Sequence, residues 1–218
     1  MKNFLVSRKR KIYLYVFVIF IILCYSISKM HSHPILLATT PIKIDGLYLT
    51  PPQEIVDFQL TDNHHQPFTK QNLQGHWTFL FFGFTDCGMV CPLTMAALRD
   101  MQRTLQQELP TNQLPQVVFV SVDPERDTVE RLNSYVTSFN PTFKGVRGDE
   151  DQTEQLEKQL HIVAAKMQVE GGKKDQYTID HSAEIMVINP EGKLQAFFSY
   201  PHKADQMIKD YKAILSAN

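Results

Sequence analysis

Two cysteines four residues apart are the side chains of this sequence that point most directly to chemistry. Cys87 and Cys91 lie in the stretch FLFFGFTDCGMVCP, in which an apolar run breaks at a glycine before the cysteines. Pro92 suits the first turn of a helix, because its φ is fixed near the helical value and its missing N–H is not needed there. The unpaired N–H groups at a helix N-terminus favour negative charge, so at least one thiol is expected to ionise more easily than a free cysteine. The spacing alone leaves metal binding, disulfide exchange and structural burial open.

A histidine late in the chain is the candidate third member of this site. His181 stands at the entrance to the predicted strand Ser182–Ile188, at the end of the polar loop Gly171–Asp180. We expect that end of the strand to lie beside the cysteine loop. Two sulfurs and one imidazole form a soft, trigonal site that suits Cu(I), whereas a structural zinc usually has a fourth protein ligand. A single histidine before a strand is also compatible with a hydrogen-bonded loop residue, and that alternative stays open.

A group of acidic residues follows a predicted buried strand. Asp123, Glu125 and Asp127 come after Gln116–Val122, at the edge where open sheets bind ligands. Asp127 has Glu130 three residues further on, a pattern typical of the start of a helix. We therefore expect these carboxylates to cap a helix and shape a turn.

Hydrophobic periodicity gives the elements that must position these residues. Runs that are apolar on both faces predict strands covered by helices on each side, and apolar residues at helical spacing predict helices that pack on the sheet. The predicted elements in chain order are the hairpin Ile55–Leu60 and Pro67–Thr69, the strand Trp77–Gly83, the helix Pro92–Glu108, the strand Gln116–Val122, a helix from Asp127, a short strand Phe143–Val146, a helix from Asp151, the hairpin Ile185–Ile188 and Leu194–Phe198, and the helix Ala204–Leu215. This order predicts an α/β fold with a thioredoxin-like central sheet and helices on both faces.

Composition limits the size and class of the protein. The chain has 218 residues, of which 43% are hydrophobic and 21% charged, and this favours one globular domain. The formal net charge is -1, and no basic stripe interleaved with aromatic residues is present, so nucleic acid is not an expected partner. Three cysteines are too few for a disulfide scaffold, and Cys24 lies in the N-terminal apolar segment.

The N-terminus is predicted to anchor the chain in a membrane. Basic residues between Lys2 and Lys11 precede an uncharged segment, Ile12–Ile27, that is just long enough to cross a bilayer as a slightly short helix. Because the positive flank stays in the cytoplasm, we expect a single-pass inner-membrane protein whose soluble domain lies on the periplasmic or an equivalent outer side. We expect the segment to be retained, although its cleavage stays open. The predicted divisions are a signal anchor over 1–29, a tether over 30–52 and a thioredoxin-like domain over 53–218.

Three stretches of the sequence carry a family resemblance: GFTDCGMVCP, SVDPERDT and YTIDHSAEIMVINPEG. In this order and at this spacing they resemble the Sco/SenC family of membrane-anchored, thioredoxin-like copper proteins, and the likeness covers Pro52–Leu215. The resemblance implies that Cys87 and Cys91 are a copper-binding, redox-active pair and that His181 is the third ligand of Cu(I) or Cu(II). It also implies a role in assembling the CuA site of cytochrome c oxidase, with the CuA-bearing subunit or another copper or thiol protein as the partner.

The cysteine loop differs from the pattern common in that family, which has His before the first cysteine and Pro then Asp after it. Here these positions hold Asp86, Gly88 and Met89. Glycine gives the loop more conformational freedom, and the charge of Asp86 is expected to raise the pKa of the neighbouring thiol.

Two functions of different classes stay open. One is a copper chaperone, and the other is a thiol-disulfide oxidoreductase that reduces partner cysteines, so whether the chain is an enzyme is undecided. Both functions use Cys87 and Cys91, whereas only Cu(I) coordination needs His181. A peroxidase is a weaker alternative, because the chain lacks the proline and threonine that thioredoxin-like peroxidases place before the nucleophile.

Overall fold

The computed structural model describes residues 16–25, 42–168 and 177–217, and the chain divides into two compact units after residue 41. The N-terminal unit is helical over 16–25, inside the predicted anchor. No helix in the described ranges is both long and apolar enough to span a bilayer. The rest of the predicted anchor, and residues 30–41 of the predicted tether, lie outside the described residues.

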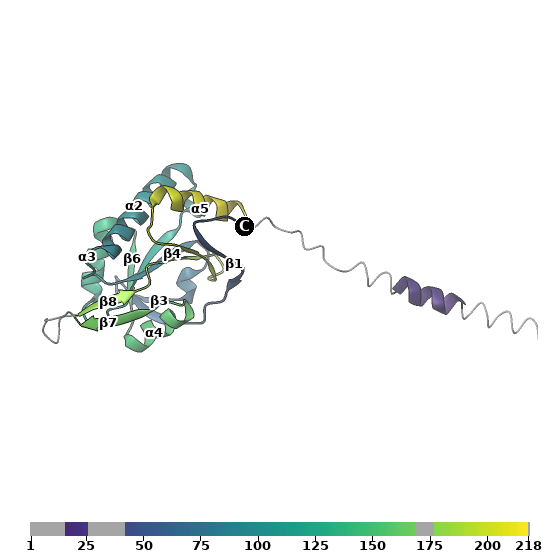
Figure 1. The fold of residues 1–218 in the computed structure, drawn as a ribbon, viewed down its shortest axis with the longest axis horizontal. Helices are drawn as coiled ribbons and strands as arrows, with labels where there is room; N and C mark the ends of the chain where they lie inside the picture. Colours follow the sequence, from purple (N-terminus) through teal and green to yellow (C-terminus); the bar gives the residue numbers. More distant parts are fainter. Residues whose placement is uncertain (1–15, 26–41, 169–176, 218) are drawn as a thin grey trace, which may run out of the picture. The chain divides into compact units, whose positions relative to one another are not determined.

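The second unit is built on an eight-stranded sheet in the order β1-β10-β9-β4-β5-β6-β2-β3. Figure 1 labels four of these strands, β1, β3, β4 and β6. Strand β4 is parallel to β5 and antiparallel to β9, and β5 is parallel to β6. Because parallel neighbours end at the same edge of a sheet, the segments that follow β4 and β5 emerge next to each other. The strands of this sheet are β1 Gly46–Gln53, β2 Gln59–Asp62, β3 Pro67–Thr69, β4 Thr78–Gly83, β5 Gln116–Ser121, β6 Lys144–Arg147, β9 Ile185–Ile188 and β10 Leu194–Phe198, while β7 Ala164–Gln168 and β8 Tyr177–His181 form a separate pair.

Helices cover both faces of this sheet, which confirms the predicted thioredoxin-like α/β arrangement. Every residue of β4 is buried, and its side chains alternate between two cores. The helices are α2 Val90–Glu108, α3 Val129–Phe139, α4 Glu150–Gln159 and α5 Ala204–Ser216, with short 3-10 turns η1 Lys70–Leu73 and η2 Thr111–Gln113. Phe79 and Phe81 pack with residues of α2, α3 and α5, whereas Leu80 and Phe82 pack with residues of α4.

Both predicted hairpins are confirmed, although β2 covers Gln59–Asp62 and not the predicted Ile55–Leu60. Three helix starts differ from the prediction, and one of them is α4, whose N-cap is Asp149 and not Asp151. β2 pairs with β3, and β9 pairs with β10, each antiparallel. Helix α2 begins at Val90, so Pro92 is its third residue. The predicted start of α3 at Asp127 is wrong, because the N-cap is Thr128, whose Oγ1 accepts a hydrogen bond from the N–H of Arg131 at 3.2 Å.

Strand β1 occupies residues that the sequence assigned to the tether. It pairs antiparallel with β10 at the edge of the sheet, so the folded unit begins before the predicted boundary at residue 53. Pro51 and Pro52 do not favour a strand, yet proline is tolerated at an edge, where its missing N–H needs no partner. Gly46 makes the close pairing possible, because a Cβ there would come within 2.0 Å of the carbonyl oxygen of Phe197.

His181 lies on a small hairpin outside the main sheet. It is the last residue of β8 and pairs with Ala164, the first residue of β7. Residues 177–180, predicted as part of a loop, are therefore in a strand. Of the two predicted starts for the next strand, Ser182 and Ile185, the structure has Ile185. Tyr177 and Ile179 alternate with polar residues, which is a strand pattern, and Ile179 is buried in the core that includes α4.

Candidate metal centre

The two cysteines lie between β4 and α2. Cys87 is half-buried in the turn after β4, and Cys91 is fully buried in the first turn of α2. Both are free thiols. The backbone N–H of Cys91 donates to Sγ of Cys87 at 3.4 Å. The N-terminus of α2 therefore contacts the first sulfur directly, where its N–H groups favour a thiolate.

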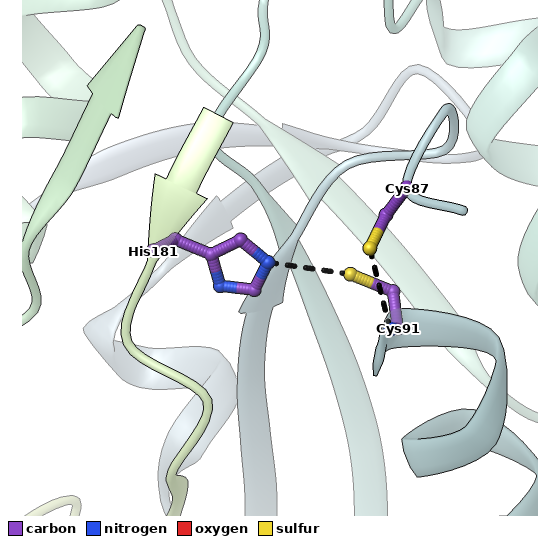
Figure 2. A group of neighbouring side chains, drawn as sticks. All are labelled: Cys87, Cys91 and His181. Atoms are coloured by element: carbon purple, nitrogen blue, oxygen red, sulfur yellow. Dashed lines mark hydrogen bonds between the residues drawn. The ribbon is translucent and has the colours of Figure 1, made fainter. Parts of the chain in front are cut away.

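His181 reaches the cysteines from the end of β8. Its Nε2 lies 3.4 Å from Sγ of Cys91, and the ligand atoms of the three side chains all lie within 4.8 Å of one another (Figure 2). Nδ1 lies 2.8 Å from the carbonyl oxygen of Ser182, which can only accept, so Nδ1 carries the proton of the neutral ring. Nε2 then offers its lone pair toward the sulfurs. Within the described part of the chain, no other group of three His, Cys, Asp or Glu side chains is close enough to share an ion.

Two aromatic rings hold the imidazole in place. The ring centroid of Phe81, on β4, lies 6.2 Å from that of His181, and the centroid of Phe84 lies 5.9 Å away. Both contacts are edge-to-face, with interplanar angles of 65° and 81°. The apolar edge of the central sheet thus limits how the imidazole can turn.

The two thiols differ in charge. The S–H of Cys91 donates to the sulfur of Cys87, and this hydrogen bond is the main cause that lowers the pKa of Cys87 to about 3, against the effect of burial. The same hydrogen bond, together with burial, raises the pKa of Cys91. Burial disfavours the charged form of His181, but hydrogen bonds to Cys87 and to the carbonyl of Ser182 outweigh it and raise the pKa of His181. The reduced pair therefore carries one negative charge at neutral pH, on its half-exposed sulfur.

A family model described as SCO1/SenC matches the chain over residues 49–216. The chain belongs to this family. The mitochondrial SCO2 homolog of Mus musculus is 32% identical over 164 residues. The match covers 74% of this chain and 62% of the mouse protein. A protein of Stutzerimonas stutzeri named as copper-binding is 32% identical over 170 residues, covering 78% of this chain and 80% of that protein. The solved structure of Arabidopsis thaliana ScoI with copper bound has a TM-score of 0.67 and 28% identity, and the match covers 74% of this chain and 98% of that one.

In this SCO1/SenC protein two arginines form ion pairs with Asp86, the residue before the first cysteine. The carboxylate of Asp86 lies 3.4 Å from Nη1 of Arg126 and 3.3 Å from Nη2 of Arg131. The pKa of Cys87 is nevertheless lowered, and Asp86 is not among the main causes of that shift. Met89, inside the same loop, is 68% exposed and turns away from the core.

The acidic cluster after β5 does not cap α3 and does not form a metal site of its own. Asp127 is fully buried and accepts hydrogen bonds from the hydroxyls of Thr85, at 2.5 Å, and Ser121, at 2.6 Å. Asp123 is also fully buried and accepts a hydrogen bond from the hydroxyl of Tyr177 at 2.7 Å. Asp127 thus fixes the start of the cysteine loop, and Asp123 connects β5 to β8.

A glycine makes room for the second sulfur. A Cβ at Gly83, the last residue of β4, would lie 2.8 Å from Sγ of Cys91 and 2.8 Å from the ring of Phe119. Real Cβ atoms do not approach neighbours so closely, and the Phe119 ring is itself fully buried. Sequence reasoning missed this role, although the glycine that interrupts an apolar strand is a known sign of close approach.

The donor set of this SCO1/SenC protein fits a soft ion. It consists of two sulfurs and one imidazole nitrogen, without a carboxylate, and a set of three suits Cu(I) better than tetrahedral zinc. One sulfur is already charged and one side of the group is half-exposed. The arrangement can therefore hold a soft cation at low coordination, and it can also carry out thiol exchange through Cys87.

Proposed function

We propose that this SCO1/SenC protein binds one copper ion as cargo through Cys87, Cys91 and His181, and delivers it to the CuA site during assembly of cytochrome c oxidase. The observation that supports this most is the convergence of the three ligand atoms within 4.8 Å, from two segments about ninety residues apart in sequence. A copper-bound relative at 28% identity and another relative named for copper binding support the choice of ion. The partner in this proposal is the oxidase subunit that bears the CuA site.

Each ligand residue has a separate task in holding the ion. Cys87 supplies a thiolate that is present before the metal arrives, because its pKa is lowered to about 3. Cys91 gives up its proton on binding, since a metal ligates the thiolate form. His181 offers Nε2 while its Nδ1 donates to the carbonyl of Ser182. Copper bound in this way would be a three-coordinate soft cation whose exposed side is accessible to the ligands of a partner.

The location of the protein is part of the same proposal. Residues 1–29 act as a single-pass anchor in the inner membrane, which keeps the folded unit on the outer side, where the CuA-bearing subunit is also expected. The support for this is the sequence pattern of basic residues before an uncharged segment. Fusing a reporter that is active only outside the cytoplasm to the C-terminus tests it, and a reporter that stays inactive would contradict it.

A thiol-disulfide oxidoreductase is the second candidate, and the low pKa of the half-exposed Cys87 favours it. In that reaction the thiolate of Cys87 attacks one sulfur of a partner disulfide, and the other partner sulfur leaves as a thiolate. Cys91 then loses its proton and displaces the first partner sulfur. The partner ends as a dithiol, and Cys87 and Cys91 end as a disulfide.

Metal analysis separates the two functions. The protein from residue 42 onward, which keeps strand β1, is reduced, loaded with Cu(I), freed of excess metal and analysed. We expect one copper per chain, lost on Cys87→Ser, Cys91→Ser or His181→Ala.

The variant His181→Ala should still reduce a model disulfide, because thiol-disulfide exchange does not need the imidazole. His64→Ala, at an exposed position in the β2–β3 turn, is the matched control and should bind copper normally. Full copper retention by His181→Ala would show that the three-ligand site is wrong.

A further inference from the structure

The two halves of the candidate copper site are carried by parts of the fold that share no strand pairing in the described residues. The cysteines follow β4 of the main sheet, whereas His181 ends β8, which pairs only with β7. A two-stranded hairpin is marginally stable on its own. The chain connects the hairpin to α4 before β7 and to β9 after His181, and side chains that contact the main body add to these two connections.

Arg126 makes such a contact. It lies in the turn after β5, and its Nη1 donates to the backbone carbonyl of Tyr177 at 3.0 Å and to the carboxylate of Asp86 at 3.4 Å. Tyr177 is the first residue of β8, and Asp86 immediately precedes Cys87. One guanidinium group thus contacts the segment that carries the histidine and the loop that carries the cysteines.

The guanidinium is itself held in a fixed orientation. Its Nε donates to the carboxylate of Asp123, which is fully buried. Its central carbon lies 3.9 Å from the ring centroid of Tyr177 and 5.6 Å from that of Phe84. The hydroxyl of Tyr177 donates to the same Asp123 at 2.7 Å, so Arg126, Tyr177 and Asp123 form a closed triangle of contacts. A planar fork that stacks and donates in several directions is specific to arginine.

From these contacts we propose that Arg126 is the positioning residue that fixes His181 beside the cysteine pair. It does not touch the ligand atoms, and it acts by tying the start of β8 to the residue before Cys87. The copper readout below depends on the proposed function, but the positioning itself is a property of the metal-free protein.

The chain offers a matched control in a second arginine. Arg131 lies on α3 and contacts the same carboxylate, with Nη2 3.3 Å from Asp86, while its Nε donates to the hydroxyl of Thr85 at 2.6 Å. Its polar contacts are with the cysteine loop, with Asp127 and with the N-cap of α3, and none of them reaches β8. Both arginines therefore stabilise the cysteine loop, whereas Arg126 alone of the two also holds the hairpin.

The first test measures amide hydrogen exchange in the reduced, metal-free full chain. Arg126→Gln is expected to speed exchange in β7 and β8 about tenfold or more, with β4 and β5 unchanged, because the hairpin opens locally. Arg131→Gln should leave β7 and β8 within about threefold of the wild-type rates. Equal effects of the two substitutions on the hairpin would overturn the proposal. Should Arg126→Gln not fold, Tyr177→Ala removes the stacking partner, and it should loosen the same two strands.

The second test measures Cu(I) affinity by competition with a chelator. Arg126→Gln should weaken binding about 10- to 100-fold, as is usual for residues that orient a metal ligand. Arg126→Lys keeps the charge but lacks the planar fork, so it should lie nearer to Arg126→Gln than to the wild type. Full recovery by lysine would contradict the proposed geometry. A wild-type chain that takes up no copper would defeat the proposed function only, since hydrogen exchange would still decide the role of Arg126.

Discussion

The cysteine half and the histidine half of the candidate site are built in different ways. The cysteines follow the central strand β4, and the backbone of the sheet and of α2 places them, with Cys91 fully buried. His181 ends a hairpin that is held by side-chain contacts and by one buried apolar residue, Ile179. Because of this difference, a substitution in one half should impair the ligands of that half and leave those of the other half in place. Substitutions on the sheet side should change the pKa of the thiols. Substitutions on the hairpin side should displace the imidazole of His181 from the site, while the alkylation rate of Cys87 stays near that of the wild type.

Truncating the apolar contact of the hairpin should have the largest effect. Ile179→Ala removes a side chain that is 5% exposed and packs in the core with α4, and we expect a loss of about 2–4 kcal/mol in the free energy of unfolding. Copper affinity should fall, while the alkylation rate of Cys87 should stay near that of the wild type. Urea denaturation and iodoacetamide kinetics measure the two effects. Thr178→Ala, at an exposed position on the same strand, is the control and should be nearly neutral.

Filling the space beside the second sulfur tests the cysteine half. Gly83→Ala places a methyl group 2.8 Å from Sγ of Cys91, and the crowding should cost about 1–3 kcal/mol of stability. Because the S–H donor is displaced from Cys87, the pKa of Cys87 should rise, and a pH titration of thiolate absorbance would show it. Gly88→Ala has no atom within 4 Å of its added Cβ and is the control. An unchanged titration in Gly83→Ala would contradict the assigned role of the Cys91 hydrogen bond.

A buried carboxylate makes the hairpin side sensitive to pH. Glu157, on α4, lines a cavity together with Ala164 and Ile179, and burial, followed by the charge of Glu154, raises the pKa of Glu157 to about 7. The folded state then binds more protons than the unfolded state between the ordinary value, 4.5, and about 7, so stability falls as pH rises through that window. Glu157→Gln should therefore increase stability by about 2 kcal/mol at pH 8 and have little effect at pH 4. Thermal unfolding at both values measures this, and an equal shift at both would argue against titration of Glu157.

Removing the cap of α3 should have the smallest effect. Thr128→Ala loses the hydrogen bond from the N–H of Arg131, and we expect a loss of about 1 kcal/mol in the free energy of unfolding. Thr128→Ser should restore most of it. Copper affinity should not change, because the lost hydrogen bond is local to the first turn of α3. A large loss of copper binding would show that the two halves are less independent than their construction indicates.

The cysteine half could be predicted from sequence far better than the histidine half. The apolar run before Cys87 and the proline after Cys91 are local signals, and they gave β4 and the start of α2 within two residues. The strand that ends at His181 does not stand out in the sequence, because a polar, glycine-bearing stretch that favours a loop precedes Tyr177. The alternation of apolar and polar residues that follows is too short to outweigh that stretch. β1 was missed for a similar reason, since its two prolines are tolerated only at a sheet edge.

The contacts of Arg126 lay beyond sequence reasoning for another reason. Its partners Asp86, Asp123 and Tyr177 come from three separate segments. Nothing in the local pattern of the SVDPERDT stretch shows which of its charges point inward, and the expected caps were assigned to carboxylates that are in fact buried. Pairings of this kind follow from the packing of the sheet and the hairpin, which only the folded chain defines.

The hydrogen bond from Nδ1 of His181 to the carbonyl of the very next residue, Ser182, has a further consequence. The acceptor belongs to the same short segment as the imidazole, so it travels with the ring if the hairpin shifts away from the sulfurs. The ring can then withdraw and return in the same tautomer, without trading a proton with water at each visit. In the proposed handover of copper, the imidazole therefore needs no proton exchange, and Cys91 is the ligand that has to regain a proton.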